Sequence, residues 1–183
     1  MEKILKLDNA VYQLYLKEED IQKRVSELAS QITADYKDKL PVFVGVLNGA
    51  FLFFADLLKN IEIDCEVDFI KISSYGDETE SSGIVQMKKG FSAGLSDRHI
   101  ILVEDIVDSG LSLKFLRSYI NDKKPLSLKF VTLLHKKGTA KVPVEIDYTG
   151  FEIEDKFVIG YGLDYAQLKR NLRNIYQVIE EKN

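Results

Sequence analysis

HIILVEDIVDSGLS, residues 99–112, is the stretch of this sequence that decides the fold. Its apolar start predicts a buried strand that leads into two neighbouring acidic residues. The small residues Asp108, Ser109 and Gly110 predict a turn, and a helix is expected over 111–120. Unpaired backbone N–H groups at such a turn, together with the helix dipole behind them, favour a bound phosphate. The stretch therefore predicts a strand, turn and helix unit with a phosphate site.

The remaining chain repeats this alternation of strands and helices. Apolar residues at helical spacing predict helices over 18–36 and 51–58. Short apolar runs predict strands over 42–47, 65–73, 85–87, 98–103, 127–134 and 157–161, with 175–179 as a strand or short helix. The polar segment 74–83 predicts a long loop or lid. This order favours an α/β fold with a mostly parallel central sheet flanked by helices, and without a linker we expect one domain over residues 1–183.

The composition excludes several classes of protein. The chain has 183 residues, 45% of them hydrophobic, and a net charge of −4 without a long basic run, so we expect no nucleic-acid partner. We also expect no membrane span or secretory signal, and a cytoplasmic location, because no long apolar segment is present. Cys65 is the only cysteine and is interpreted as a buried residue within a strand.

Ligands of such sheets bind at the carboxyl ends of the strands, where polar residues stand at 48–49, 74–75, 104–112, 136–137 and 160–164. Glu104 and Asp105 directly follow the predicted strand. Two adjacent carboxylates there favour Mg²⁺, ribose hydroxyls or both, the alternative being solvated loop acids. The chain has neither a GxGxxG nor a GxxxxGK[ST] motif, which disfavours dinucleotide dehydrogenases and P-loop nucleotide triphosphatases.

ILVEDIVDSGLS resembles the phosphoribosyl-pyrophosphate signature of type I phosphoribosyltransferases. Four further segments resemble hypoxanthine-guanine phosphoribosyltransferases: VGVLNGAFLFFADLL (44–58), VDFIKISSYGD (67–77), VTLLHKK (131–137) and GFEIEDKFVIGYGLDY (150–165). The resemblance implies the type I phosphoribosyltransferase fold with a small hood subdomain and a flexible lid. It also implies Mg²⁺-dependent transfer of 5-phosphoribosyl from phosphoribosyl pyrophosphate to N9 of hypoxanthine or guanine, by a homodimer or homotetramer. The products would be IMP or GMP and pyrophosphate.

The resemblance assigns the opening stretch to the ribose and its phosphate. Glu104 and Asp105 would face the ribose hydroxyls directly or through Mg²⁺. Asp108 would be the general base near N7 of the purine. The bland alternative is an Asx cap of the following helix, and the two roles are compatible. The 5′-phosphate would be held by Asp108, Ser109, Gly110, Leu111 and Ser112.

The purine is assigned to residues downstream. Lys136 would donate to the exocyclic O6 and so select 6-oxopurines, whereas the alternative is an ordinary surface lysine. Phe157 would stack on the base, although an aromatic residue alone is more often part of a core. Val158 would meet the edge of the base through its backbone.

Five residues are assigned to pyrophosphate, metal or lid, namely Asn48, Gly49, Ser74, Tyr75 and Arg170, and Asp164 is assigned as a second Mg²⁺-associated carboxylate. Solvated charges are the alternative for Asp164 and Arg170. Asn48 stands where the family often has lysine, and the Leu47–Asn48 peptide is a candidate for strained geometry. Ser74 and Tyr75 would begin the lid that excludes water.

Two other functions are alternatives. The first is a non-catalytic regulator that senses phosphoribosyl pyrophosphate, and the second is a transferase for adenine or a pyrimidine. The regulator is disfavoured because the residues that the resemblance assigns to the base and the metal are all present, namely Asp108, Lys136, Phe157 and Asp164. Lys136 and Phe157 in their family context oppose other bases. The two histidines, His99 and His135, lack metal-ligand spacing and are expected to be spectators.

Overall fold

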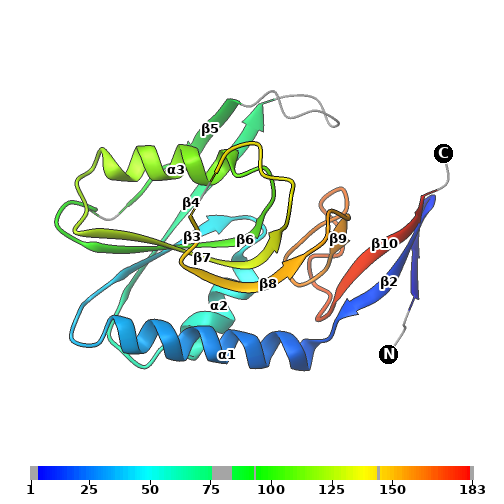
Figure 1. The fold of residues 1–183 in the computed structure, drawn as a ribbon, viewed down its shortest axis with the longest axis horizontal. Helices are drawn as coiled ribbons and strands as arrows, with labels where there is room; N and C mark the ends of the chain where they lie inside the picture. The colour runs from blue at the N-terminus through cyan, green and yellow to red at the C-terminus, as the bar shows by residue number, and fades with distance from the viewer. Residues whose placement is uncertain (1–3, 76–83, 93, 144, 182–183) are drawn as a thin grey trace.

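The computed structural model describes residues 4–75, 84–92, 94–143 and 145–181. Its centre is a six-stranded sheet in the order β5-β4-β3-β6-β7-β8 (Figure 1). All neighbouring strands are parallel except β4 and β5, so the predicted parallel-rich sheet is confirmed. The strands are β3 (Val42–Leu47), β4 (Glu66–Tyr75), β5 (Ile84–Lys89), β6 (His99–Val107), β7 (Ser127–Lys136) and β8 (Tyr148–Ile153).

Helices cover both faces of this sheet. α1 (Glu18–Asp35) and α2 (Phe51–Lys59) lie on one side and α3 (Leu111–Asn121) on the other (Figure 1). Successive side chains of β6 alternate between the two layers: Ile101 and Val103 pack in the core with α1 and α2, and Ile100 and Leu102 pack with α3. A strand buried on both faces reads as a continuous apolar run, which is why β6 was recognisable in the sequence.

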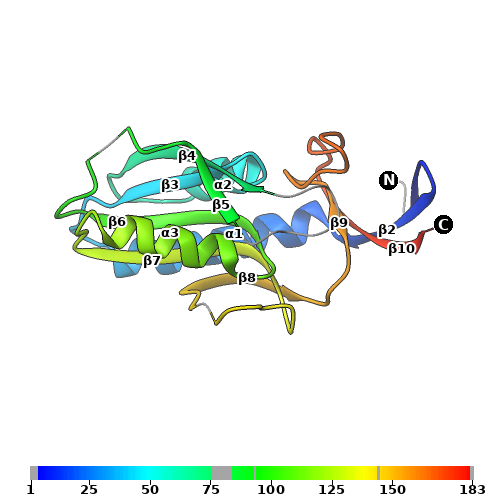
Figure 2. The ribbon, with the colours of Figure 1, turned by 90° about the horizontal axis from the view of Figure 1, so that it is seen from above.

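A second sheet forms the hood. It has four antiparallel strands in the order β1 (Ile4–Leu7), β2 (Ala10–Leu16), β10 (Ile175–Glu181) and β9 (Val158–Ile159). Figures 1 and 2 show it beyond one end of the large sheet, with both chain termini nearby. The predicted small subdomain is confirmed, and it combines the two ends of the chain with a short strand beside the candidate base pocket.

Several predicted elements differ in extent from the observed ones. β6 continues to Val107, with Ile106 opposite Leu134 of β7, so Glu104 and Asp105 lie within the strand and not after it. The strand expected over 157–161 is limited to β9, because Gly160 adopts a positive φ of 97° that turns the chain. Strands β1, β2 and β8 were not predicted from the sequence.

Two expectations about the first half of the chain also need correction. Ser74 and Tyr75 are the last residues of β4 and pair with β5, so they belong to a strand and not to a loop. Residues 76–83 of the expected lid lie outside the described part of the chain. Cys65 precedes β4 and is only half-buried, because the parallel ladder between β3 and β4 begins at Glu66.

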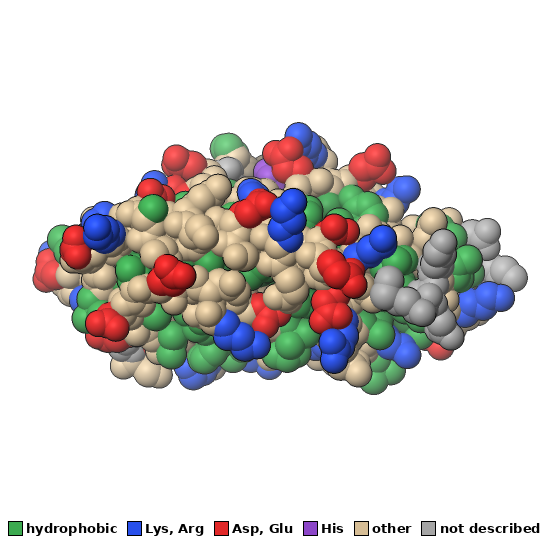
Figure 3. Space-filling model, turned by 90° about the horizontal axis from the view of Figure 1, so that it is seen from below, with side chains coloured by type: hydrophobic (Ala, Val, Ile, Leu, Met, Phe, Trp, Pro, Cys, Tyr) green, Lys and Arg blue, Asp and Glu red, His purple; other side chains and the backbone are tan. Residues whose placement is uncertain are grey.

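The molecular surface carries charges of both signs. On the face seen in Figure 3, Lys and Arg side chains lie among Asp and Glu side chains. None of the described helices is both long and apolar enough to cross a membrane.

Candidate active site

A cavity of about 410 Å³ opens at the carboxyl ends of β3 and β6. We call it the acidic cavity, because carboxylates from two separate parts of the chain line it. It brings together seven of the residues that the sequence assigned to the ribose, metal or pyrophosphate: Asn48, Gly49, Glu104, Asp105, Ser112, Asp164 and Arg170. Residues more than 100 positions apart therefore meet in one cavity.

Glu104 is buried and Asp105 is half-buried where they line this cavity. Burial raises the pKa of Glu104 well above its usual range, and the adjacent Asp105 raises it further. Burial also raises the pKa of Asp105, although its Oδ1 accepts a hydrogen bond from the Ile106 N–H at 2.9 Å. Glu104 Oε2 is buried without a hydrogen-bond partner in the described structure. A buried, unpaired oxygen of this kind favours a ligand that donates a hydrogen bond or a metal ion.

The acidic cavity fits a metal ion that is shared with a substrate. Glu104, Asp105 and Asp164 supply carboxylate oxygens, the ligands that Mg²⁺ prefers, and Glu104 Oε2 has no other partner. Within the described residues, however, no group of three His, Cys, Asp or Glu side chains could hold a metal ion by itself. Mg²⁺ usually takes one or two protein carboxylates and completes its coordination with substrate oxygens and water. The residues fit that arrangement.

Backbone approaches carboxylate closely on one side of the cavity. A Cβ atom at Gly49 would overlap the carboxylate of Asp105, and a Cβ at Gly162 would overlap the carbonyl oxygen of Gly49. Gly162 also has a φ of +100°, which favours glycine. The preceding Leu47–Asn48 peptide is cis. Gly49 was identified from the sequence, but Gly162 was missed because nothing in its local pattern indicates a contact with residue 49.

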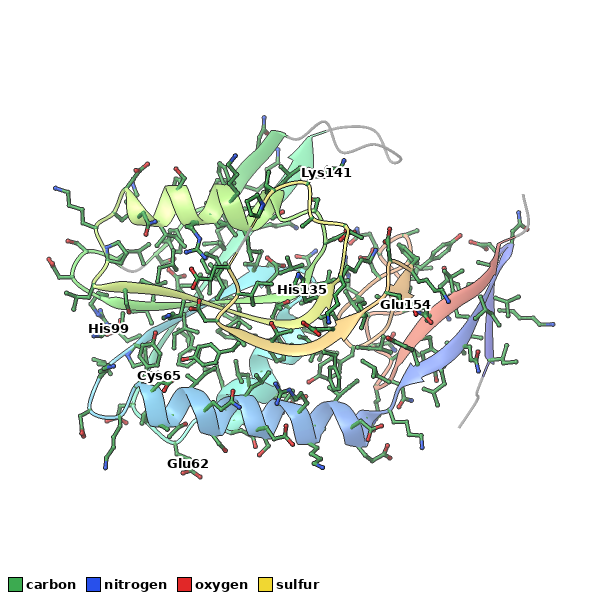
Figure 4. The ribbon with its side chains drawn as sticks, viewed as in Figure 1. Glu62, Cys65, His99, His135, Lys141 and Glu154 are labelled. Carbon is green, nitrogen blue, oxygen red and sulfur yellow. The ribbon has the colours of Figure 1, made fainter. Side chains whose placement is uncertain are left out.

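The predicted phosphate turn lies at the start of α3. Gly110 is the N-terminal cap with a φ of +79°, and no side chain caps the helix. Ser109 Oγ accepts a long hydrogen bond from Leu111 N–H at 3.5 Å, and Lys141 N–H donates to Ser109 O at 3.0 Å. Figure 4 shows Lys141 near this end of α3. The alternative reading of Asp108 as an Asx cap is therefore wrong.

A second cavity of about 250 Å³ adjoins the first, and we call it the purine cavity because the resemblance assigned three of its lining residues, Lys136, Phe157 and Val158, to the base. It is lined by Asp105, Ile106, Asp108, Lys136, Phe157, Val158, Leu163 and Asp164, and so shares two carboxylates with the acidic cavity. Phe157 is 46% exposed and makes an edge contact with Tyr12, at 6.4 Å between ring centroids. Its interpretation as a core residue is therefore wrong, because nearly half of the residue is exposed.

Lys136 is the cation of the purine cavity. Its side chain is 11% exposed, which rules out an ordinary surface lysine. Its Nζ lies 3.2 Å from Asp108 Oδ2 and 3.0 Å from Asp155 Oδ1. Burial alone would lower the pKa of Lys136, but the hydrogen bonds to Asp155 and Asp108 outweigh it and raise this pKa. Lys136 is thus held in its charged, donating form.

Asp164 and Arg170 form an ion pair of 2.7 Å at the wall of the acidic cavity. Asp164 Oδ2 also accepts from the Gln167 N–H at 2.7 Å, and Arg170 Nη1 donates to Gly162 O at 2.8 Å. The two charges are therefore ordered by the loop that carries them and are not freely solvated.

The two histidines lie apart from these cavities. Figure 4 shows His99 at the opposite end of the large sheet from Glu154, and its Nδ1 lies 2.8 Å from Ser127 Oγ. His135 lies in β7 and lines neither cavity.

The arrangement can now be compared with known proteins. The family model for the phosphoribosyl transferase domain matches residues 12–166. The hypoxanthine-guanine phosphoribosyltransferase of Bacillus subtilis (strain 168) is 45% identical over 162 residues, which cover 88% of this chain and 90% of that protein. This chain belongs to the hypoxanthine-guanine phosphoribosyltransferases.

Other members of this family agree in sequence and in fold. The hypoxanthine-guanine phosphoribosyltransferase of Dictyostelium discoideum is 44% identical over 168 residues, covering 90% of this chain and 93% of that protein. A crystal structure of a hypoxanthine-guanine phosphoribosyltransferase from Bacillus anthracis, with HEPES in its active site, has a TM-score of 0.87 at 43% identity. The match covers 91% of this chain and 98% of that one. The type I phosphoribosyltransferase fold expected from the sequence is confirmed.

Sequence reasoning missed Asp155 and Thr139, which contact residues of the purine cavity without lining it. Thr139 Oγ1 lies 3.1 Å from Asp108 O and 3.3 Å from Lys136 O, between the two segments that form the purine cavity. Asp155 is one acid in the run 152–155 and carries no individual signal. Its contact arises because Lys136 pairs with Ile153 at the end of the β7–β8 ladder.

Proposed function

We propose that this phosphoribosyltransferase transfers the 5-phosphoribosyl group from phosphoribosyl pyrophosphate to N9 of hypoxanthine or guanine, giving IMP or GMP and pyrophosphate. The observation that carries the proposal is the pair of adjoining cavities that share Asp105 and Asp164. One offers carboxylates to a ribose, a metal ion and pyrophosphate, and the other offers an ammonium group and a partly exposed aromatic ring to a planar base.

The purine cavity supports the choice of base. Lys136 donates to the O6 atom of a 6-oxopurine, whereas the 6-amino group of adenine is itself a donor and would leave the ammonium group unpaired. Asp108 accepts the proton at N7 as the base becomes bonded through N9. Phe157 stacks on the ring, and the backbone of Val158 meets its edge.

The opposite side of the site supports the donor. The turn 109–112 holds the 5′-phosphate with backbone N–H groups at the start of α3. Glu104 and Asp105 accept hydrogen bonds from the ribose hydroxyls, and Asn48, Gly49 and Arg170 face the pyrophosphate. The bond between N9 and C1′ forms as the bond between C1′ and the pyrophosphate oxygen breaks, so the protein contributes mainly alignment and electrostatic stabilisation.

Mg²⁺ belongs to the proposal as the cofactor, held by Glu104, Asp105 and Asp164 together with substrate oxygens. When bound, it neutralises the charge of the leaving pyrophosphate. We also propose a homodimer or homotetramer that acts in the cytoplasm, and light scattering during size-exclusion chromatography measures the assembly.

A nucleotide-formation assay with phosphoribosyl pyrophosphate, Mg²⁺ and a panel of bases tests the function. We expect product with hypoxanthine and guanine and little with adenine. Asp108→Asn should slow turnover by about 100-fold or more, the usual contribution of a general base. It should still bind phosphoribosyl pyrophosphate in calorimetry. Asp122→Asn, at the exposed end of α3, is the matched control. No product with any purine would refute the proposal.

A further inference from the structure

Asp155 lies outside the purine cavity but forms an ion pair with Lys136, which lines it. It does not line that cavity, but instead lines a neighbouring one together with Tyr15 and Gln177 of the hood. Its carboxylate is nevertheless nearer to Lys136 Nζ than that of Asp108, at 3.0 Å against 3.2 Å. The ammonium group is thus held between one carboxylate inside the cavity and one outside it.

The backbone fixes this arrangement from both sides. Lys136 stands opposite Ile153 in the β7–β8 ladder, and the Lys137 N–H donates to Ile153 O at 3.0 Å. Asp155 follows two residues later, beyond the end of β8. Figure 4 shows its neighbour Glu154 where this end of β8 approaches the hood. Thr139 Oγ1 lies within hydrogen-bonding distance of both Asp108 O and Lys136 O, which keeps the main chains of these two segments close. The carboxylates of Asp108 and Asp155 then set the position of Lys136 Nζ.

A bound 6-oxopurine changes the partners of Lys136. Asp108 has to turn towards N7 of the base, so its hydrogen bond to Lys136 is replaced by one from Lys136 to O6. A mostly buried ammonium group with no fixed anion would resist this exchange, because it would keep its only carboxylate partner. Asp155 provides a second carboxylate, which stays paired with Lys136 because it does not contact the base.

We propose that Asp155 is a positioning residue that anchors Lys136 Nζ at the edge of the purine cavity, so that the 6-oxo oxygen of the base can replace Asp108 as its second partner. The inference rests on the proposed function and on the role of Lys136 in it. It goes further by assigning recognition of the 6-oxo group to a pair of residues, of which only Lys136 touches the base.

The chain contains a matched control for this pair. Lys137 and Glu152 are the neighbouring residues on the same two segments, and Lys137 Nζ forms an ion pair with Glu152 Oε2. Neither of them lines the purine cavity. Glu152→Gln therefore removes a carboxylate of the same kind, from the same strand pair, without changing the partners of Lys136.

Steady-state kinetics of Asp155→Asn, Asp155→Glu and Glu152→Gln test the inference. In Asp155→Asn we expect KM for hypoxanthine to rise about fivefold to tenfold, the range of a partly exposed charged hydrogen bond. KM for phosphoribosyl pyrophosphate should change less than about twofold. A general loss of structure would instead raise the KM values of both substrates. Asp155→Glu should recover most of the loss, and Glu152→Gln should match the wild type.

A double-mutant cycle gives the decisive comparison. In a Lys136→Met background, Asp155→Asn should change kcat/KM for hypoxanthine less than about twofold, because the group it positions is gone. Three outcomes would each overturn the inference while leaving the proposed function intact. They are equal effects of Asp155→Asn in both backgrounds, equal rises of both KM values, and an Asp155→Asn variant indistinguishable from Glu152→Gln. A wild-type protein that makes no nucleotide would overturn both.

Discussion

Replacing Glu104 by glutamine should make the substrate-free protein more stable at neutral pH while removing its activity. The carboxyl of Glu104 is buried and has a raised pKa, and its Oε2 has no hydrogen-bond partner among the described residues. Below the ordinary pKa of glutamate, Glu104 is protonated in both the folded and the unfolded state, so its raised pKa does not reduce the free energy of unfolding. As the pH rises, the unfolded state loses this proton more readily than the folded state, so the wild type loses stability.

The size of the effect follows from the number of protons involved. One proton bound only in the folded state costs at most about 1.4 kcal/mol for each pH unit above the ordinary pKa. For a chain of this length, that corresponds to roughly 3–5 °C in Tm per pH unit. Glutamine cannot ionise, so the advantage of Glu104→Gln over the wild type should be near zero at about pH 4.5 and should grow towards about pH 7.

Urea unfolding of the substrate-free wild type and of Glu104→Gln across this pH range measures the difference directly. Glu152→Gln, which removes an exposed carboxylate, is the control and should show no such growth. Glu104→Gln should also lose most of its nucleotide formation, because an amide replaces the anion proposed to receive the ribose and the metal ion. A stability difference that is independent of pH, or a less stable variant at neutral pH, would refute the argument.

Three further variants probe separate contacts. Gly49→Ala should abolish most activity and cost about 1–3 kcal/mol of stability, because its Cβ would overlap the carboxylate of Asp105. Turnover and urea unfolding measure the two effects, and wild-type behaviour would contradict the close approach of Gly49 to Asp105. Asn48→Lys should lower the inhibition constant for pyrophosphate severalfold by adding a cation to the acidic cavity, and an unchanged constant would show that the backbone alone acts there. Tyr161→Phe should lose about 1–2 kcal/mol of stability, because it removes a 2.7 Å hydrogen bond from the Tyr161 hydroxyl to Asp56. Turnover should be retained, because neither residue lines either cavity, and an unchanged Tm would contradict the predicted loss of stability.

The sequence predicted those parts of the site that are contiguous in the chain. The apolar run of β6, the acidic pair after it and the small-residue turn before α3 follow one another within residues 99–112. Their order is dictated by local requirements, namely a strand buried on both faces and a turn without bulky side chains beside a helix start. Even so, the sequence did not locate the end of β6, because the ladder with β7 continues past Glu104 to Val107.

Tertiary structure alone decided the contacts between distant segments. Gly49, Asp105 and Gly162 meet because the two segments that carry the glycines approach β6 near the carboxyl end of the sheet. Asp155 finds Lys136 because the register of β7 against β8 places Ile153 opposite the lysine. Strand register depends on partners far away in the chain, and a single acid within an acidic run cannot indicate its partner.

What the sequence by itself determined is therefore the chemical inventory and the elements that present it: a parallel-rich α/β fold, an acidic pair, a small-residue turn before a helix, and a lysine and an aromatic residue that are predicted to meet the base. What only the tertiary structure decided is which of these groups are buried together. Burial raises the pKa of Glu104, whereas Phe157 stays partly exposed at the purine cavity, and both results depend on how the hood and the loops pack around the sheet. The physical reason is that desolvation and pairing are properties of the packed surroundings and not of the residue.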